Sequence, residues 1–115
     1  MYMNDKIKIY TSRINYSGNI KKIDITRKSA SRYKAIAPTW DMVIRYKDGS
    51  LSEKDYKIAY TKIMNSCKQM IKVMLEESGN SCVLVCYCPK DTFCHRILLA
   101  KFIEEHFNAE YIGEI

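Results

Sequence analysis

The chain of 115 residues suits one compact domain, and its 47% hydrophobic content is sufficient for a core. No apolar run approaches the roughly 20 residues of a membrane span, and the first residues lack the apolar segment of a signal peptide. Because the five cysteines are odd in number, a disulfide framework is disfavoured, and we expect a cytoplasmic protein with reduced thiols and no membrane partner.

The formal charge of +6 is unevenly distributed along the chain. Residues 1–50 hold eleven Lys and Arg against four Asp, a net of +7, whereas residues 51–115 hold eight against nine acidic residues, a net of −1. A basic region of this kind attracts phosphate groups, in nucleic acid or in a nucleotide. A solvated lysine-rich surface has the same pattern, so the charge alone leaves these interpretations open.

Two strands and a short helix are expected in the first half. Alternating β-formers over residues 6–10 predict a strand, after which Thr11, Ser12 and Arg13 form a polar group at its end. Residues 20–26 predict a second strand, and residues 27–34 an irregular basic stretch. Pro38 marks the first turn of a helix, in which we expect Trp40 to pack into the core.

A long helix is predicted between Ser52 and Gly79. Ser52 is a favourable N-cap, and Asp55 fits an acidic variant of the capping box. Gly79 is the expected C-terminal stop. The apolar positions on one face of this helix are Tyr56, Ala59, Ile63, Cys67, Met70, Ile71 and Met74.

The last third of the chain predicts strand, loop, helix and strand. Residues 82–86 are apolar on both faces, which is typical of a buried central strand in a parallel sheet. A loop over 89–93, a helix over 95–107 and a short strand at 111–112 follow. Strands interleaved with helices predict an α/β fold, with a small, mostly parallel sheet flanked by helices in one Rossmann-like layered domain over residues 1–115.

The chemistry is expected where the buried strand passes through a loop into the last helix. Ligands in open α/β sheets bind beyond the carboxyl ends of the strands, and a helix start adds positive character. We therefore expect a lowered pKa for Cys94, an anion bound with Arg96 as partner, and His95 as a base or ligand. The segment reads Cys86-Tyr87-Cys88-Pro89-Lys90-Asp91-Thr92-Phe93-Cys94-His95-Arg96.

This segment resembles the signature of the YeaO-like proteins, the domain of unknown function 488, in small bacterial and phage members. The resemblance rests on Val83-Leu84-Val85-Cys86-Tyr87-Cys88 followed by Cys94-His95-Arg96, on Ile9-Tyr10-Thr11-Ser12, on Asp24-Ile25-Thr26-Arg27, on Ala37-Pro38-Thr39-Trp40 and on Tyr56-Lys57-Ile58-Ala59-Tyr60. It implies an α/β fold with a pocket at the Cys-His-Arg step. Many members carry an acidic residue at or beside Cys88, and the thiol here favours thiol or metal chemistry over carboxylate chemistry.

The first functional hypothesis is a pocket for a small anionic, nucleotide-like ligand, by which the protein sequesters or modifies a nucleotide signal. Hydroxyl and basic groups that converge at neighbouring strand ends suit phosphate or ribose recognition. The ligand-binding residues of this hypothesis are Thr11, Ser12, Arg13, Thr26, Arg27, Cys86, Tyr87, Cys88, Cys94, His95 and Arg96.

Three further hypotheses remain open, beside a domain without chemistry. Cys86, Cys88, Cys94 and His95 form the ligand set of a zinc or iron site. A thiol enzyme would use Cys94 as nucleophile, assisted by His95 or Arg96, although adjacent helical residues such as Cys94 and His95 point about 100° apart. The basic stretch 21–34 would suit nucleic acid, although it matches no named motif. The sequence makes no prediction of the oligomeric state.

Overall fold

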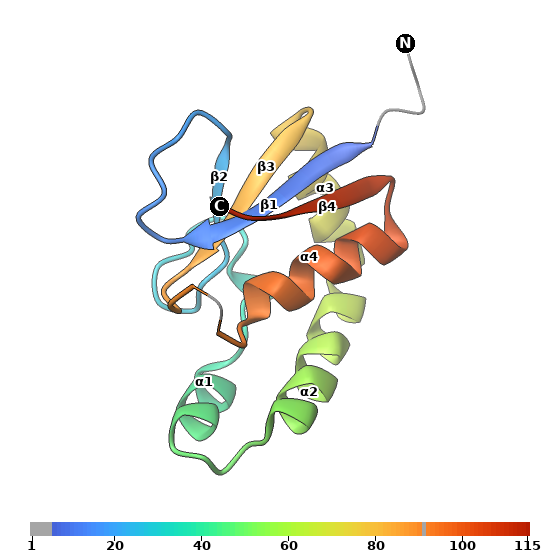
Figure 1. Ribbon diagram of the computed structural model, residues 1–115. Helices are drawn as coiled ribbons and strands as arrows, with labels where there is room; N and C mark the ends of the chain where they lie inside the picture. The colour runs from blue at the N-terminus through green and yellow to red at the C-terminus, as the bar shows by residue number, and fades with distance from the viewer. Residues whose placement is uncertain (1–5, 91) are drawn as a thin grey trace.

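The computed structural model describes residues 6–90 and 92–115, so Asp91 of the predicted loop lies outside the described residues. The elements in chain order are β1 (Ile7–Arg13), β2 (Lys22–Asp24), the 3₁₀ helix η1 (Lys34–Ile36), α1 (Trp40–Lys47), α2 (Glu53–Ser66), α3 (Lys68–Ser78), β3 (Ser81–Cys86), α4 (His95–His106) and β4 (Ala109–Glu114). Every pairing in the sheet is parallel, in the order β2-β3-β1-β4 (Figure 1). The predicted α/β fold is confirmed.

Strand β3 is the buried strand that the apolar run predicts. It lies between β2 and β1, and every residue from Cys82 to Cys86 is buried. A strand with neighbours on both sides and side chains covered on both faces has no place for polar residues. This position brings Cys86 to the carboxyl end of the sheet, where the loop toward α4 begins.

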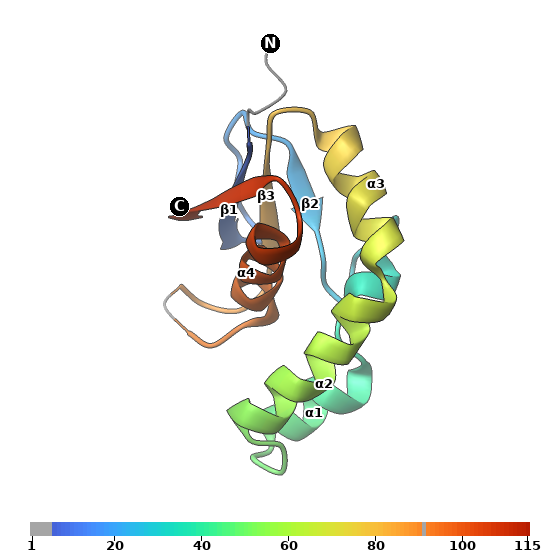
Figure 2. The same cartoon turned by 90° about the vertical axis from the view of Figure 1, so that its right-hand side faces the viewer.

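One contiguous core joins the sheet to the helices. Ile9 of β1 and Leu84 of β3 pack with Ile71 of α3 and with Leu99 and Ile103 of α4. Because side chains alternate along a strand, Ile9 and Leu84 lie on the same face of the sheet as their register partners Cys82 and Thr11. In the second view, α3 runs beside the sheet, and α2 and α1 continue beyond its end (Figure 2).

The long helix predicted between Ser52 and Gly79 is two helices. The chain bends at Cys67, which ends α2 and begins α3 with φ −111° and ψ 18°. Tyr60 of α2 donates to the carbonyl of Ile36 at 2.7 Å, whereas Ile71 of α3 packs into the core beneath the sheet. Both helices therefore contribute to the same core, one on each side of the bend.

The ends of this helical region agree with the sequence. The Ser52 side chain accepts the backbone N–H of Asp55, as an N-cap does. Gly79 ends α3 with φ 77°, a left-handed conformation that favours glycine. The described residues include no helix long and apolar enough to cross a membrane.

Trp40 is not a core residue, and its predicted burial is wrong. Its side chain is 52% exposed, although it begins a regular helix capped by Thr39. Helix α1 lies beyond the end of the sheet, beside α2, so its first turn has no sheet to pack against (Figures 1 and 2).

Candidate functional site

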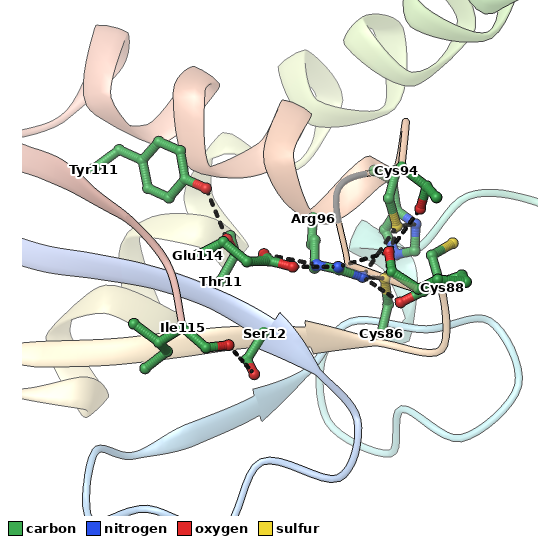
Figure 3. A network of polar contacts seen from close by, with 12 residues as sticks. Thr11, Ser12, Cys86, Cys88, Cys94, Arg96, Tyr111, Glu114 and Ile115 are labelled. Carbon is green, nitrogen blue, oxygen red and sulfur yellow. Dashed lines mark hydrogen bonds and ion pairs between the residues drawn. The ribbon is translucent and has the colours of Figure 1, made fainter.

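Three thiols meet where β3 ends and α4 begins. Cys86 is the last residue of β3, and Cys94 is the N-cap of α4, with extended backbone angles of φ −156° and ψ 150°. The Sγ atoms of Cys86, Cys88 and Cys94 lie within 4.8 Å of one another (Figure 3). Those of Cys86 and Cys94 are 2.7 Å apart, and all are free thiols. The three side chains are close enough to hold one metal ion.

Arg96 ties this cluster to the end of the sheet. Its guanidinium Nη1 donates to the Cys86 Sγ at 3.0 Å and to the Cys88 carbonyl at 3.0 Å, and Nη2 donates to the Pro89 carbonyl at 3.2 Å. On the other edge, Nε donates to the Glu114 carboxylate at 3.1 Å, and Nη2 pairs with the same group (Figure 3). The guanidinium is fully buried, and its N–H groups donate to partners inside the protein. Arg96 therefore positions the thiols, and it does not face an incoming anion as the sequence had led us to expect.

Cys86 is the thiol of the cluster whose pKa is lowered. The thiols of Cys88 and Cys94 donate hydrogen bonds to its sulfur and lower its pKa, against the opposing effect of burial. Sharing those protons raises the pKa of Cys88 and of Cys94. The lowered pKa that we expected for Cys94 therefore belongs to Cys86, because Cys86 is the acceptor of the thiol hydrogen bonds and Cys94 is a donor.

His95 is buried beside Cys94 and is held in one orientation. Its Nε2 lies 2.9 Å from the Ile25 carbonyl, to which it donates, and its Nδ1 lies 3.7 Å from the Cys94 Sγ. Burial lowers the pKa of His95, so the neutral ring leaves Nδ1 as an acceptor toward the thiol. The expectation that these neighbours point apart is wrong, because Cys94 is an extended N-cap and not part of the helix.

A cavity of about 260 Å³ opens beside the thiols. Its walls are mostly aromatic and apolar and come from α1, α2 and the loop after β3, while basic side chains stand among them. The lining residues are Thr26, Arg27, Lys28, Pro38, Trp40, Val43, Tyr46, Lys47, Tyr56, Cys86, Tyr87, Cys88, Phe93, Cys94 and His95. The cavity thus joins the basic first half of the chain to the cysteine-rich second half.

Two basic side chains beside the cavity, Arg27 and Lys28, contact neutral groups. Arg27 donates to the carbonyls of Pro38, Lys34 and Ala37, which are neutral acceptors. The Lys28 ammonium lies 5.0 Å from the centre of the Tyr87 ring. Within the described part of the chain, the ion pairs involve neither residue. An anionic ligand would therefore find positive potential at this cavity.

Several predicted site residues lie elsewhere or are already engaged. The Thr26 hydroxyl lines the cavity but donates to Asp24 Oδ1 at 2.7 Å. Thr11 Oγ1 lies 2.7 Å from the Tyr111 hydroxyl, and Ser12 Oγ donates to the Ile115 carbonyl at 2.8 Å (Figure 3). The described residues that line the cavity do not include Thr11, Ser12, Arg13 or Arg96. Consecutive strand residues point to opposite faces, so the group at the end of β1 cannot converge on one pocket.

The aromatic walls were missed by reasoning from the sequence. Trp40, Val43 and Tyr46 line the cavity from one side of α1, and Tyr56 joins them from α2. Their spacing of three residues marks a shared helix face, which is the signal that the sequence offered. That pattern predicts a buried face but not whether it covers a core or a ligand.

One protein-family model matches most of the chain, including this site. The model DUF488-N3a, described as the active DUF488-N3 subclade, matches residues 2–107. The chain belongs to the DUF488 family. The matched region contains the thiol cluster and the cavity of this DUF488 protein, and the predicted membership is confirmed. Searches of curated proteins and of solved structures find no match.

Proposed function

We propose that this DUF488 protein binds a small anionic, nucleotide-like ligand in the cavity above the thiol cluster. The observation that carries the proposal is the combination of aromatic walls with basic groups that have no acidic partner among the residues that the structure describes. Trp40 and Tyr87 offer ring faces on which a planar base can stack, and Arg27, Lys28 and Lys47 offer charge for a phosphate.

The volume of the cavity limits the size of the ligand that it can enclose. At about 260 Å³ it lies just below the range of roughly 300–1,000 Å³ for small-molecule sites. A nucleoside or mononucleotide is thus the largest group that it encloses, with a phosphate near the rim. An extended strand of nucleic acid would need a longer groove, so we favour a free nucleotide over an oligonucleotide.

The predicted binding set changes accordingly. The predicted residues that line the cavity keep their proposed place. They are Thr26, Arg27, Cys86, Tyr87, Cys88, Cys94 and His95. Aromatic stacking replaces the hydroxyl contacts that we expected from the end of β1. The proposed recognition therefore depends on α1 and on the segment after β2 more than on β1.

The test is a thermal-shift and titration screen with tag-free protein. Mono-, di- and cyclic nucleotides at millimolar concentration are expected to raise the melting temperature. Trp40→Ala and Lys28→Ala should each weaken binding by about tenfold, the loss of one stacking or charge contact. Lys72→Ala removes the same charge from an exposed site on α3 and should leave binding unchanged.

Two outcomes would contradict the proposal. One is no stabilisation by any nucleotide. The other is tight, steeply salt-dependent binding of a short single-stranded oligonucleotide together with no binding of free nucleotides, since that indicates a nucleic-acid surface.

A further inference from the structure

The sulfur atoms of three cysteines lie close together beside the cavity. We propose that Cys86, Cys88 and Cys94 hold one thiophilic metal ion, such as Zn²⁺, at the floor of the cavity. All three line the cavity, and their sulfurs form one cluster in the part of the chain that the structure describes. The ion would take three thiolates and present its remaining position to the cavity.

The distances permit this arrangement with a small adjustment. Zinc–thiolate bonds of about 2.3 Å place sulfurs roughly 4 Å from one another, inside the 4.8 Å limit of the cluster. Cys86 and Cys94, whose sulfurs are 2.7 Å apart, need to separate by about 1 Å. Cys94 has this freedom, because as the N-cap it lies outside the regular helix.

The charges also favour a cation. Three thiolates and a divalent ion leave one negative charge in place of three, and the buried Arg96 guanidinium, which also pairs with Glu114, stands 3.0 Å from the Cys86 sulfur. Glu114 occupies the opposite edge of that guanidinium and fixes its orientation. Soft thiolate ligands select zinc and similar ions over magnesium or calcium.

His95 is the residue in which this site differs from the four-ligand set of the sequence hypothesis. The cluster comprises the three cysteines without His95. The imidazole Nε2 is committed to the Ile25 carbonyl, and Nδ1 faces the Cys94 thiol at 3.7 Å. In the proposed site His95 keeps its hydrogen bond to the Ile25 carbonyl and lies beside Cys94 without coordinating the ion.

The experiment uses tag-free, fully reduced protein titrated with Cd²⁺ alone. Thiolate-to-metal charge-transfer absorption should saturate at one ion per chain. Cys86→Ser, Cys88→Ser and Cys94→Ser should each lower its intensity by about one third and weaken binding at least about tenfold. Cys67→Ser and Cys82→Ala, which alter the cysteines outside the cluster, should behave like the wild type.

Cys88→Ser is the decisive variant, because Cys88 is only partly buried and its loss leaves the core intact. Far-UV circular dichroism verifies its fold. Unchanged absorption in this variant, or no absorption in reduced wild-type protein, would overturn the proposal.

His95→Gln keeps a donor for the Ile25 carbonyl and removes Nδ1. It should retain the full absorption intensity at saturation; loss of the band would overturn the three-thiol set. Since no nucleotide is present, the result is independent of whether the cavity binds one.

Discussion

Arg96 is the residue on which the site depends, and its charge is buried between two anionic groups. One edge of the guanidinium pairs with Glu114, and the other contacts the Cys86 thiolate. Burial alone lowers the pKa of Arg96. The hydrogen bonds and charges of Glu114 and Cys86 raise this pKa by more than burial lowers it, so the guanidinium stays charged. A buried charge of this kind is tolerated only while its partners remain.

Removal of the carboxylate should therefore be costly. Glu114→Gln is expected to lower the free energy of unfolding by about 3 kcal/mol, because it leaves a buried guanidinium with a single anionic partner. Urea denaturation at neutral pH measures the change. Glu110→Gln, at an exposed position on the same strand, is the matched control. An effect no larger than that of the control would show that Glu114 is not needed to stabilise Arg96.

Among the elements, α1 is the one that turns a sheet edge into a cavity. It is only eight residues long, and among its residues only Met42 is buried. Its start is held by Thr39, whose side chain accepts the Met42 N–H at 3.1 Å. A short helix with so little buried surface depends on its cap, so the cap also controls the position of Trp40.

Thr39→Ala should loosen this element without unfolding the protein. We expect a loss of about 1 kcal/mol in the stability of α1, typical of a removed N-cap, and a corresponding weakening of nucleotide binding of several-fold. Hydrogen exchange of the α1 amides and ligand titration measure the two effects. The Thr61 hydroxyl donates to the Lys57 carbonyl in an exposed part of α2. Thr61→Ala should therefore change neither the hydrogen exchange of α1 nor the nucleotide binding.

In the helical region after Ser52, the sequence pattern predicted both ends of the region but not the break inside it. Its N-cap and its glycine stop were predicted correctly, because each depends on contacts within three or four residues. The break at Cys67 was not predicted, since the sequence there carries neither proline nor glycine. Tyr60 and Ile71, on either side of the break, both pack into the core with residues distant in sequence.

At the scale of the whole molecule, the contiguous core supports unfolding as one cooperative unit, so the ionisation of a single site affects global stability. Cys86 has a lowered pKa in the folded protein and an ordinary value of about 8.5 in the unfolded chain. The unfolded chain therefore takes up a proton at neutral pH. The stabilisation by the thiolate is fully present above the unfolded pKa and is lost as the pH falls.

The free energy of unfolding should consequently rise by up to about 1.4 kcal/mol per pH unit between pH 7 and pH 8. Urea titrations in the presence of reductant and chelator, which keep the thiols free of disulfides and metal, measure this slope. Cys86→Ala should abolish most of the slope, and Cys67→Ser should preserve it. A slope that is the same in both variants would show that Cys86 is not the thiolate.

The sequence by itself determined the order of the elements, the buried central strand and the strand–loop–helix segment with its cysteines. These features follow from side-chain periodicity and from capping residues, which act between near neighbours. It also placed Arg27, Cys86, Tyr87, Cys88, Cys94 and His95 in one candidate site, and the structure brings all of them to one cavity.

Only the tertiary structure decided which charges meet and what encloses the cavity. Glu114 reaches Arg96 because β4 adds to the sheet beside β1, and Trp40 lines the same cavity as the thiols because α1 lies beyond the strand ends. The pairing of β4 with β1 also engages Thr11 and Ser12, which the sequence had left available to a ligand. Such contacts join residues far apart along the chain, and no local pattern encodes the strand order that creates them.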